Sequence, residues 1–510
     1  MVMAKWLQVF AVLVVICVST LPAAANVTLP TVFGDHMVVQ REIPIPIWGT
    51  AKPGEQVTVS LADETAKAVA GKDGRWNVRL KPRPAGGPLI LTVTGMSKVV
   101  IKDVLVGDVW FCAGQSNMAM MVKQCKAAPT EIANSTNPMI RCYTTARAAS
   151  PKPLTDTKGR WQVAGPDSTG GFSASAYFFA RDIQQTLKIP IGIIVSAWGG
   201  SNMEAFARME VLNAHPAEAK PYFRLWEQRK AAFPAELAAA KEAAAQAQAQ
   251  GKPAPKLRTL ETHQARPASI YNGMVAPFVP YAIKGFLWNG GAANRGRAAE
   301  YSVLMPAMIQ DWRKQWGEGQ LPFFLVQMAN WSPDNPDTHF EALREAMLKT
   351  AQTPGVGMVV TIDIGEEHNI HPKNKQEVGR RLALQAKAKA YGFKIMADGP
   401  TYDSMAVEGD TIRLKFTSVG DGLAARGGGE LRGFEIAGED RKFWRGSAKI
   451  DGDTILVRSD VVPHPVAVRY AWEMFPDCNL INVHGLPASP FRTDTWPLQE
   501  SNAGANAEGG

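Results

Sequence analysis

The sequence has little aromatic content, little excess charge of either sign, and no long apolar run. Only 8% of the 510 residues are aromatic, and 55 Lys and Arg stand against 47 Asp and Glu, a formal net charge of +8. The basic residues are scattered among acidic ones, which argues against a nucleic-acid-binding protein. No run reaches the roughly 18 apolar residues of a membrane-spanning helix. The chain is 46% hydrophobic, and its length is sufficient for about three globular domains.

Cysteine is scarce as well, with five in the chain. One of them, Cys17, lies near the N-terminus, and the others are Cys112, Cys125, Cys142 and Cys478. No two have CxxC spacing, and no close Cys and His cluster indicates zinc. The last four permit three complete disulfide pairings, and free buried thiols fit the sequence equally well, so the redox state stays open.

The first 25 residues have the features of an export signal. Lys5 supplies a positive charge, residues 9–18 an apolar stretch, and residues 23–25 a small-residue cleavage site. The sequence therefore predicts a mature chain that begins at Asn26. We expect it to be secreted or periplasmic, with no stable membrane insertion after the leader is removed.

Short β-rich runs separated by turns occupy residues 26–104 and 398–497, and predict β-sandwich-like domains at both ends. Residues 105–397 alternate apolar strand candidates with amphipathic helical patterns, which is typical of a parallel sheet covered on both faces. An Ala-rich stretch at about 213–267 predicts a helical insertion, and residues 498–510 a frayed tail. The strand candidates of the middle region are 104–111, 191–196, 283–288, 323–327 and 356–362, and its helix candidates are 174–187, 301–316, 339–350 and 375–391.

Small polar residues and glycines follow the first three of these strands. Active sites of open α/β sheets form beyond the carboxyl ends of the strands, so these positions are candidates. Ser116 follows the first strand, Gly199 and Gly200 follow the second, and Asn294 follows the third. A serine there could act as a nucleophile, and glycine N–H groups or an Asn amide could stabilise an oxyanion.

The last strand is followed by Asp363, Glu366, His368 and His371. A serine nucleophile needs a base, and the base needs a group that orients its imidazole, and both types of residue lie on this loop. The same side chains could ligate a metal, but the loop lacks HExxH or a similarly rigid helical spacing. We therefore expect no metal.

Several segments together resemble the sialate O-acetylesterases, a branch of the SGNH-type carbohydrate esterases. They include Gly-Gln-Ser-Asn-Met at 114–118, Tyr-Asn-Gly-Met at 271–274 and Ile-His-Pro at 370–372, in the family's order. The resemblance spans residue 27 to about 395. It implies an SGNH-like α/β core and a cofactor-free enzyme that removes acetyl groups from sugars, typically sialic acids.

The resemblance also implies roles for individual residues. Ser116 would be the nucleophile and His371 its base. The N–H of Ser116, that of Gly200 or its neighbour Gly199, and the Asn294 side chain would form the oxyanion hole.

The sequence departs from the family pattern at three places. The family's Gln, Glu and Ser before the Asn are replaced by Gly290, Ala292 and Ala293. The loss of the Gln and Glu affects the expected sugar more than the acyl chemistry. Ala119 stands where the family commonly has Glu. His368 occupies the position of the usual triad Asp, so Asp363, or else Glu366, would orient the base. A Ser/His dyad oriented by a backbone carbonyl is the alternative.

Other functions fit parts of the pattern. The enzyme could act on a different acetylated polysaccharide. The fold could be a non-catalytic carbohydrate-binding protein on a decayed esterase core, which Ala at 292–293 would favour and the intact Ser116 and His371 oppose. A peptidase or lipase is less compatible, because the Ala-rich insertion is too polar for a lipase lid. The sequence does not indicate the oligomeric state.

Overall fold

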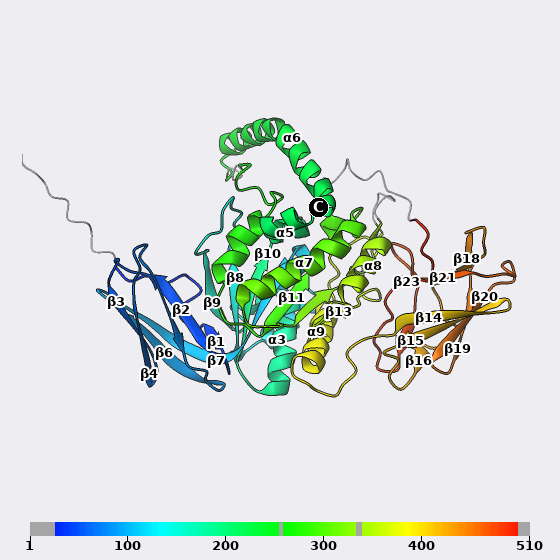
Figure 1. Cartoon of the computed structure of the whole chain (residues 1–510), viewed down its shortest axis with the longest axis horizontal. Coiled ribbons are helices and arrows are strands. Elements are labelled where there is room, and N and C mark those ends of the chain that lie inside the picture. Colours follow the sequence, from blue (N-terminus) through cyan, green and yellow to red (C-terminus); the bar gives the residue numbers. More distant parts are fainter. Residues whose placement is uncertain (1–25, 254–258, 333–338, 498–510) are drawn as a thin grey trace, which may run out of the picture.

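The computed structural model describes residues 26–253, 259–332 and 339–497. The predicted leader and tail lie outside these residues. Three regions follow one another along the long axis of the molecule: an N-terminal β-region, a central α/β region and a C-terminal β-region (Figure 1). Within the described parts of the chain, none of the helices combines the length and apolar character that crossing a bilayer requires.

The central region contains a large mixed sheet. Its strands run in the order β13-β12-β11-β7-β10-β8-β9, and all neighbours are parallel except β8 and β9. Their bounds are β7 Lys98–Gly114, β8 Asn137–Thr145, β9 Gly159–Ala164, β10 Ile191–Ala197, β11 Gly285–Asn289, β12 Phe323–Val326 and β13 Val356–Val359. The five predicted strands are confirmed, and β8 and β9 extend the sheet beyond the prediction.

Strand β7 belongs to two regions at once. Its first part pairs with β6 (Gly86–Thr94) and β1 (Val38–Gln40) of the N-terminal region, and its last part pairs with β10 and β11. The boundary predicted near residue 104 therefore falls inside one continuous strand of 17 residues. No loop separates the N-terminal region from the central sheet.

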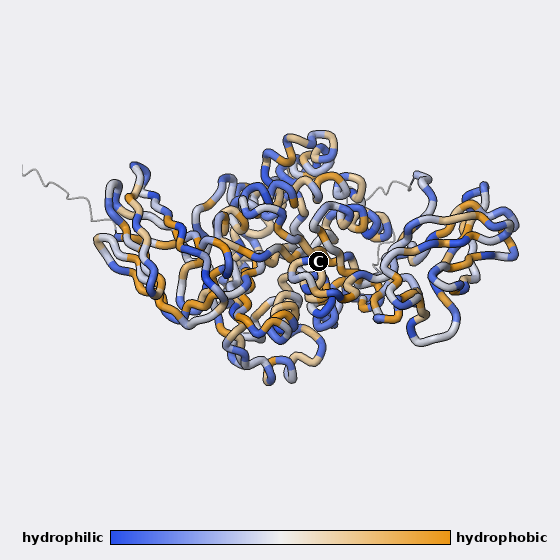
Figure 2. The backbone as a smooth tube through the Cα atoms, turned by 60° about the horizontal axis from the view of Figure 1, so that its bottom comes forward, coloured by the Kyte–Doolittle hydropathy of each residue, from blue (hydrophilic) through white to orange (hydrophobic). Residues whose placement is uncertain are grey.

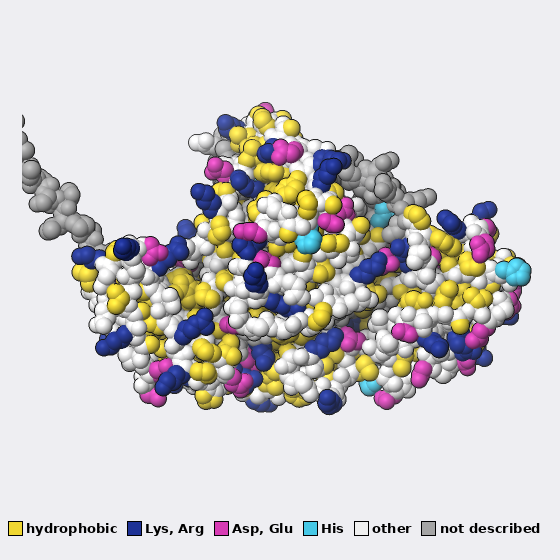
Figure 3. Space-filling view, viewed as in Figure 1, with side chains coloured by type: hydrophobic (Ala, Val, Ile, Leu, Met, Phe, Trp, Pro, Cys, Tyr) yellow, Lys and Arg dark blue, Asp and Glu magenta, His cyan; other side chains and the backbone are white. Residues whose placement is uncertain are grey.

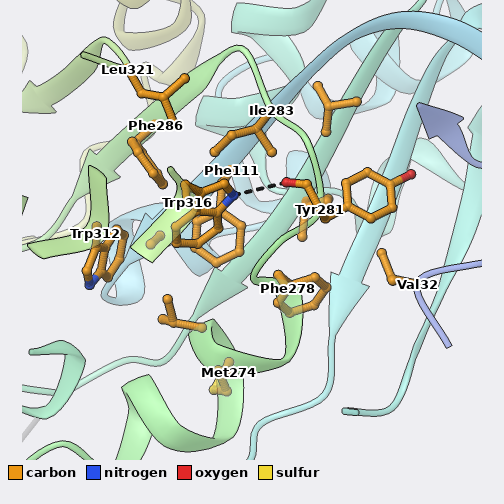
Figure 4. Close-up of a cluster of buried hydrophobic side chains, with 14 of the residues drawn as sticks. Val32, Phe111, Met274, Phe278, Tyr281, Ile283, Phe286, Trp312, Trp316 and Leu321 are labelled. Atoms are coloured by element: carbon orange, nitrogen blue, oxygen red, sulfur yellow. Dashed lines mark hydrogen bonds between the residues drawn. The ribbon is translucent and has the colours of Figure 1, made fainter. Parts of the chain in front are cut away.

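Both faces of the central sheet are buried, as expected for parallel strands. Along β7, Val109, Phe111 and Ala113 pack into one apolar cluster, while Trp110 and Cys112 pack into another on the opposite face. Figure 4 shows aromatic rings gathered around Phe111 on the first face. The strand that leads to the candidate nucleophile is thus fixed from both sides.

Two helix pairs cover the two faces. Helices α3 (Ala174–Leu187) and α9 (Lys375–Lys389) pack on one face, and α7 (Ala298–Trp316) and α8 (Phe340–Thr350) on the other. All four match the predicted helices to within three residues. A long helix, α6 (Pro216–Ala249), extends away from the body at the predicted insertion (Figure 1), and Ala219 and Tyr222 are its buried residues.

The two end regions consist mainly of short antiparallel strands along which apolar and polar residues alternate (Figure 2), with β1 as a parallel partner of β7. In the N-terminal region, β2 (Ile45–Thr50) pairs with β5 (Arg75–Leu80), while β3 (Gln56–Leu61) pairs with β4 (Glu64–Val69) and β6. The C-terminal strands are β14 Thr401–Glu408, β15 Thr411–Thr417, β16 Leu423–Ala425, β17 Phe434–Ala437, β18 Phe443–Arg445, β19 Ser447–Asp451, β20 Thr454–Arg458, β21 Ala467–Tyr470, β22 Leu480–Asn482 and β23 Phe491–Arg492.

The four described cysteines are free thiols, and Cys112, Cys125 and Cys142 are buried. Burial raises the pKa of Cys125 to about 11 and that of Cys142 to about 12, so both are protonated at neutral pH. On the face of the molecule in Figure 3, Lys and Arg side chains lie interspersed with Asp and Glu. The mild net charge is therefore spread over this face and not concentrated in a patch.

A buried guanidinium joins the central and C-terminal regions. Arg344 of α8 donates to the carbonyls of Met328 and Ala329 in the central region and of Glu473 and Met474 in the C-terminal region, at 2.6–3.1 Å. Its side chain is fully buried, and burial lowers its pKa to about 10. A single side chain thus satisfies four carbonyls across the junction.

We predict that Arg344→Met destabilises the protein by at least about 3 kcal/mol, because buried carbonyls left without donors cost about 1–3 kcal/mol each. Urea or thermal unfolding of the mature chain measures the change. Lys349→Met on the same helix is the matched control: this lysine is 55% exposed in an i,i+4 pair with Glu345, and its loss is expected to cost about 0.5 kcal/mol. Equal effects of the two substitutions would contradict the assigned role of Arg344.

Candidate active site

The candidate residues meet at the carboxyl ends of β7, β10 and β11. Strand β7 has β10 on one side and β11 on the other, so the chain crosses to opposite sides of β7 as it continues. Ligand sites in open α/β sheets form at such a change of direction. The loops that follow these three strands carry Ser116, Gly199, Gly200 and Asn294.

The turn after β7 requires a glycine. Gly114 has φ +139°, and a Cβ on it would lie 2.3 Å from the Asn289 carbonyl oxygen of β11. Only glycine permits both this backbone conformation and this close approach. The turn places half-buried Ser116 at the first position of the short helix α1 (Ser116–Ala119).

Ser116 and His371 are in direct contact although 255 residues separate them. The Ser116 Oγ and the His371 Nε2 lie 2.6 Å apart, which is hydrogen-bonding distance for a nucleophile and its base. Burial lowers the pKa of His371 below its ordinary 6.5, and the charge of Lys375 lowers it further. At neutral pH the imidazole is therefore unprotonated and able to accept the serine proton.

Gln115 links the loops around the serine. Its side chain donates to the Ser201 carbonyl after β10 and accepts from the Gly291 N–H after β11 at 2.8 Å. The residue is 4% exposed. Because one planar amide makes both bonds, it fixes the two flanking loops relative to the Ser116 turn.

Three backbone N–H groups near Ser116 are without acceptors. Those of Ser116, Gly199 and Gly200 donate to no group among the described residues. A Cβ added to Gly199 would lie 3.2 Å from the Ser116 Cβ, so this loop packs directly against the serine. Unpaired N–H groups beside a nucleophile are the elements of an oxyanion hole.

The Asn294 side chain has buried partners of its own. It is fully buried; its Oδ1 accepts from the Met203 N–H at 3.0 Å, and its Nδ2 donates to Glu204 at 2.8 Å. Glu204 in turn pairs with Arg297. The side chain thus joins the loop after β10 to the loop after β11, and the second N–H of its Nδ2 has no acceptor among the described residues.

Asp363 also has partners other than the predicted one. Both its oxygens bond to Arg381 of α9 at 2.7 Å, and Oδ2 lies 2.9 Å from Arg426 of the C-terminal region. Within the described chain, no hydrogen bond joins Asp363 to His371. The acid predicted to orient the base instead connects α9 to the C-terminal region.

Glu366, the alternative acid, bonds to the Asn369 side chain at 3.0 Å and the Lys373 N–H at 2.6 Å. Asn369 accepts from the His371 N–H at 3.0 Å and donates to its carbonyl at 3.0 Å. Glu366 therefore supports the base through the loop backbone and does not contact its ring. His368 is exposed and lies away from these bonds.

Sequence reasoning missed several residues that hold the site. Gln115 and Lys375 lie inside or beside segments that resemble the family, which was a usable signal. Glu204 and Arg297 gave no such signal, because the neighbouring sequence does not reveal that a charged pair will be buried. Among the described residues, no three His, Cys, Asp or Glu side chains are grouped in a way that could hold a metal ion.

The fold matches that of a known carbohydrate esterase. A crystal structure of a carbohydrate acetylesterase from Xanthomonas citri superposes with a TM-score of 0.79 at 36% identity, covering 92% of this chain and all of that one. The protein is therefore a carboxylic ester hydrolase of the carbohydrate esterase class.

The model of the family "carbohydrate esterase, sialic acid-specific acetylesterase" matches residues 106–240 and 259–388. The human sialate O-acetylesterase is 27% identical over 92% of this chain and 93% of its own length, and the mouse enzyme is 27% identical over 90% and 92%. The chain belongs to the sialic acid-specific acetylesterase family, and the resemblance found in the sequence is confirmed.

We predict that Asp363→Ala destabilises the protein by about 1–3 kcal/mol, because it removes one of the two carboxylates that pair with the buried Arg381 guanidinium and leaves Glu377 as the remaining one. The two side chains are 6% and 3% exposed. Urea unfolding measures the effect, with Glu367→Ala as control, since Glu367 is exposed on the same loop and its removal should cost about 0.5 kcal/mol or less. A stable Asp363→Ala protein would contradict this role.

Proposed function

We propose that this protein is a serine esterase that removes O-acetyl groups from sialic acids. In this proposal Ser116 is the nucleophile and His371 is the general base. The observation that carries it is the 2.6 Å contact between the Ser116 Oγ and the His371 Nε2 beside unpaired backbone N–H groups. The family and its curated relatives supply the substrate class.

In the first half of the reaction, the Ser116 Oγ attacks the carbonyl carbon of the acetyl group while its proton moves to the His371 Nε2. The tetrahedral intermediate carries a negative oxygen, which accepts hydrogen bonds from the backbone N–H groups of Ser116 and of Gly200 or Gly199. As the intermediate collapses, the sugar oxygen leaves with the proton from His371. The product is an acetyl ester on Ser116.

In the second half, water takes the place of the sugar. His371 accepts a proton from the water as its oxygen attacks the acetyl carbon. The same N–H groups stabilise the second oxyanion. Collapse of this intermediate releases acetate and returns the proton to Ser116, so no cofactor or redox step is required.

We assign Asn294 a supporting part in this mechanism. Its bonds to Met203 and Glu204 fix the start of helix α4 (Met203–Phe206), directly after the Gly199–Gly200 turn. The amide thereby sets the position of the Gly199–Gly200 turn, and its second Nδ2 N–H remains a candidate oxyanion donor beside the backbone groups. Burial of the Glu204–Arg297 pair supports this assignment, since it makes the loop costly to displace.

We also propose that Ser116 and His371 act as a dyad. Both candidate acids have other partners, Arg381 for Asp363 and Asn369 for Glu366. The His371 backbone is held on both its N–H and its carbonyl by the Asn369 side chain. The ring is thus oriented through its own loop, and no carboxylate among the described residues bonds to it to raise its basicity.

A second substrate class has its own support. The Xanthomonas citri relative, at 36% identity, is described as a carbohydrate acetylesterase without reference to sialic acid, and Ala292 and Ala293 replace polar family residues beside the site. An acetylated polysaccharide such as xylan is therefore the alternative substrate. The acyl chemistry would be the same.

The finer features of the architecture belong to the same proposal. The order of Ser116, the Gly199–Gly200 turn and His371 along a parallel sheet supports an SGNH-type core at about 105–397. The alternating strands on either side support flanking sandwich-like domains at 26–104 and 398–497. The N-terminal 25 residues support export, and acetylated glycans outside the cytoplasm would be the substrates.

We predict that the mature protein, residues 26–510, releases acetate from 9-O-acetylated sialic acid faster than from acetylated xylan. Ser116→Ala should lower kcat by roughly 10⁴-fold or more, leaving residual catalysis from the oxyanion donors. Asn26→Ala, far from the site and exposed, serves as the handling control. Retained activity in Ser116→Ala would contradict the mechanism, and a preference for xylan would replace the substrate but keep the chemistry.

We predict that kcat/KM falls at low pH with an apparent pKa below the ordinary 6.5 of histidine. The free enzyme must hold His371 neutral, and burial together with Lys375 lowers the pKa of His371. Activity is thus present above the lowered pKa and lost as the pH falls through it. A pH profile of acetate release measures this limb. A limb above about pH 6.5 would show that the folded protein raises this pKa instead.

A further inference from the structure

Lys375 is a buried cation that the proposed chemistry does not use. It is the first residue of α9 and is 1% exposed. Its Nζ donates to the Asn117 Oδ1 at 2.6 Å, and within the described chain no carboxylate lies within ion-pair distance of it. An ammonium group without a counter-charge is costly to bury.

The position is unfavourable for a second reason. The first turn of a helix carries partial positive charge from its unpaired N–H groups, so a cation there is repelled. Asn374 caps the helix and Glu377 lies in its first turn, but Glu377 pairs with Arg380 and Arg381. A residue that breaks two rules of stability is expected where function requires it.

Lys375 determines the orientation of the Asn117 amide. An ammonium group only donates, so it must face the amide oxygen, and the amide nitrogen must then point the other way. That nitrogen donates to the Ile370 carbonyl at 3.1 Å. Asn117 follows Ser116 in the chain and Ile370 precedes His371, so this amide connects the nucleophile to the base.

The titratable groups around Lys375 come from two segments. Glu366 and His371 lie on its own loop, and Cys125 follows the short helix at Val122–Gln124. The thiol of Cys125 is protonated at neutral pH because burial raises its pKa to about 11. Glu366 is the one anion that acts on Lys375 at that pH, and its oxygens are already bonded to Asn369 and Lys373.

The groups that act on His371 are fewer. Besides burial, Lys375 is the charged group that shifts its pKa, and the direction is downward. Ser116 is its uncharged partner. The positive charge of Lys375 therefore acts on the base without an opposing carboxylate.

We propose that Lys375 is a positioning residue of the esterase, which fixes the Asn117 amide between the Ser116 turn and the His371 loop. The inference rests on the proposed function, in which Ser116 and His371 perform the chemistry.

The protonation of Lys375 determines when its charge acts on the base. Burial lowers the pKa of Lys375 to about 7, so the ammonium form is favoured as the pH falls below that value. In this form its charge lowers the pKa of His371, and removing Lys375 should raise that pKa.

The experiment compares Lys375→Met with Lys375→Gln in the mature chain, with kcat and KM for 4-nitrophenyl acetate followed from about pH 5 to about pH 8. Both variants remove the charge, so both should move the acid limb of kcat/KM up by about half a pH unit or more. Met also removes the donor to Asn117, so kcat should fall about tenfold with KM little changed. Gln keeps an N–H donor and should retain more of kcat than Met.

Lys373→Met is the matched control, because Lys373 is an exposed lysine two residues away that does not shift the pKa of His371. It should change neither the limb nor kcat. Thermal unfolding provides the structural readout: Lys375→Met should be at least as stable as the parent, since it removes a buried charge.

The inference would be overturned if the acid limb of kcat/KM moved in neither variant. It would also be overturned if kcat fell together with Tm while the acid limb stayed in place. If Lys375→Met does not fold, Lys375→Gln decides the question by the limb alone. Each variant is also measured with Ser116→Ala. Activity that survives Ser116→Ala refutes the proposed function itself. If Ser116→Ala abolishes activity but the acid limb of the Lys375 variants does not move, only the role of Lys375 is refuted.

Discussion

The hydrogen bond between Ser116 and His371 sets the geometric requirement that the surrounding structure meets. Its two atoms belong to residues near the beginning and the end of the central region's sequence, and their separation must be correct to within tenths of an ångström. The serine is placed by a turn that only Gly114 permits, and the histidine by a loop whose backbone is held by Asn369. Gln115 then fixes the neighbouring loops to the same turn. Each of these supports is a buried or half-buried polar contact, so the geometry is rigid and not dependent on mobile surface groups.

The same constraint explains why charged residues are buried around the site. Glu204 with Arg297, and Asp363 with Arg381, are buried ion pairs, a kind of contact that is often no more stabilising than well-packed apolar residues of similar volume. Here they join segments that the sheet alone does not connect: the loops after β10 and β11 in one case, and α9 with the C-terminal region in the other. Directional bonds specify the relative position of two loops, whereas apolar contacts would allow them to slide.

Much of this arrangement could be predicted from the sequence. Apolar runs located five central strands, and the residues directly after them included Ser116 and the Gly199–Gly200 turn. The rest depended on distant contacts. Strands β8 and β9 are partly polar and irregular in register, so they lacked a clear pattern. Asp363 was a reasonable choice of acid until Arg381 and Arg426, which are remote in sequence, proved to be its partners. Asn294 was assigned by analogy, and the buried Glu204 that engages it could not be foreseen.

Strand β7 also has a consequence for how the protein can be divided. A truncated chain that begins at residue 105 would cut this strand, which spans Lys98–Gly114, and would remove the pairing of β1 and β6 along its first part. Such a fragment would start with a frayed, unpaired strand end a short distance before the nucleophile. The N-terminal region is therefore better regarded as an extension of the catalytic sheet than as a detachable module. Exchanging it between relatives would require a junction outside β7.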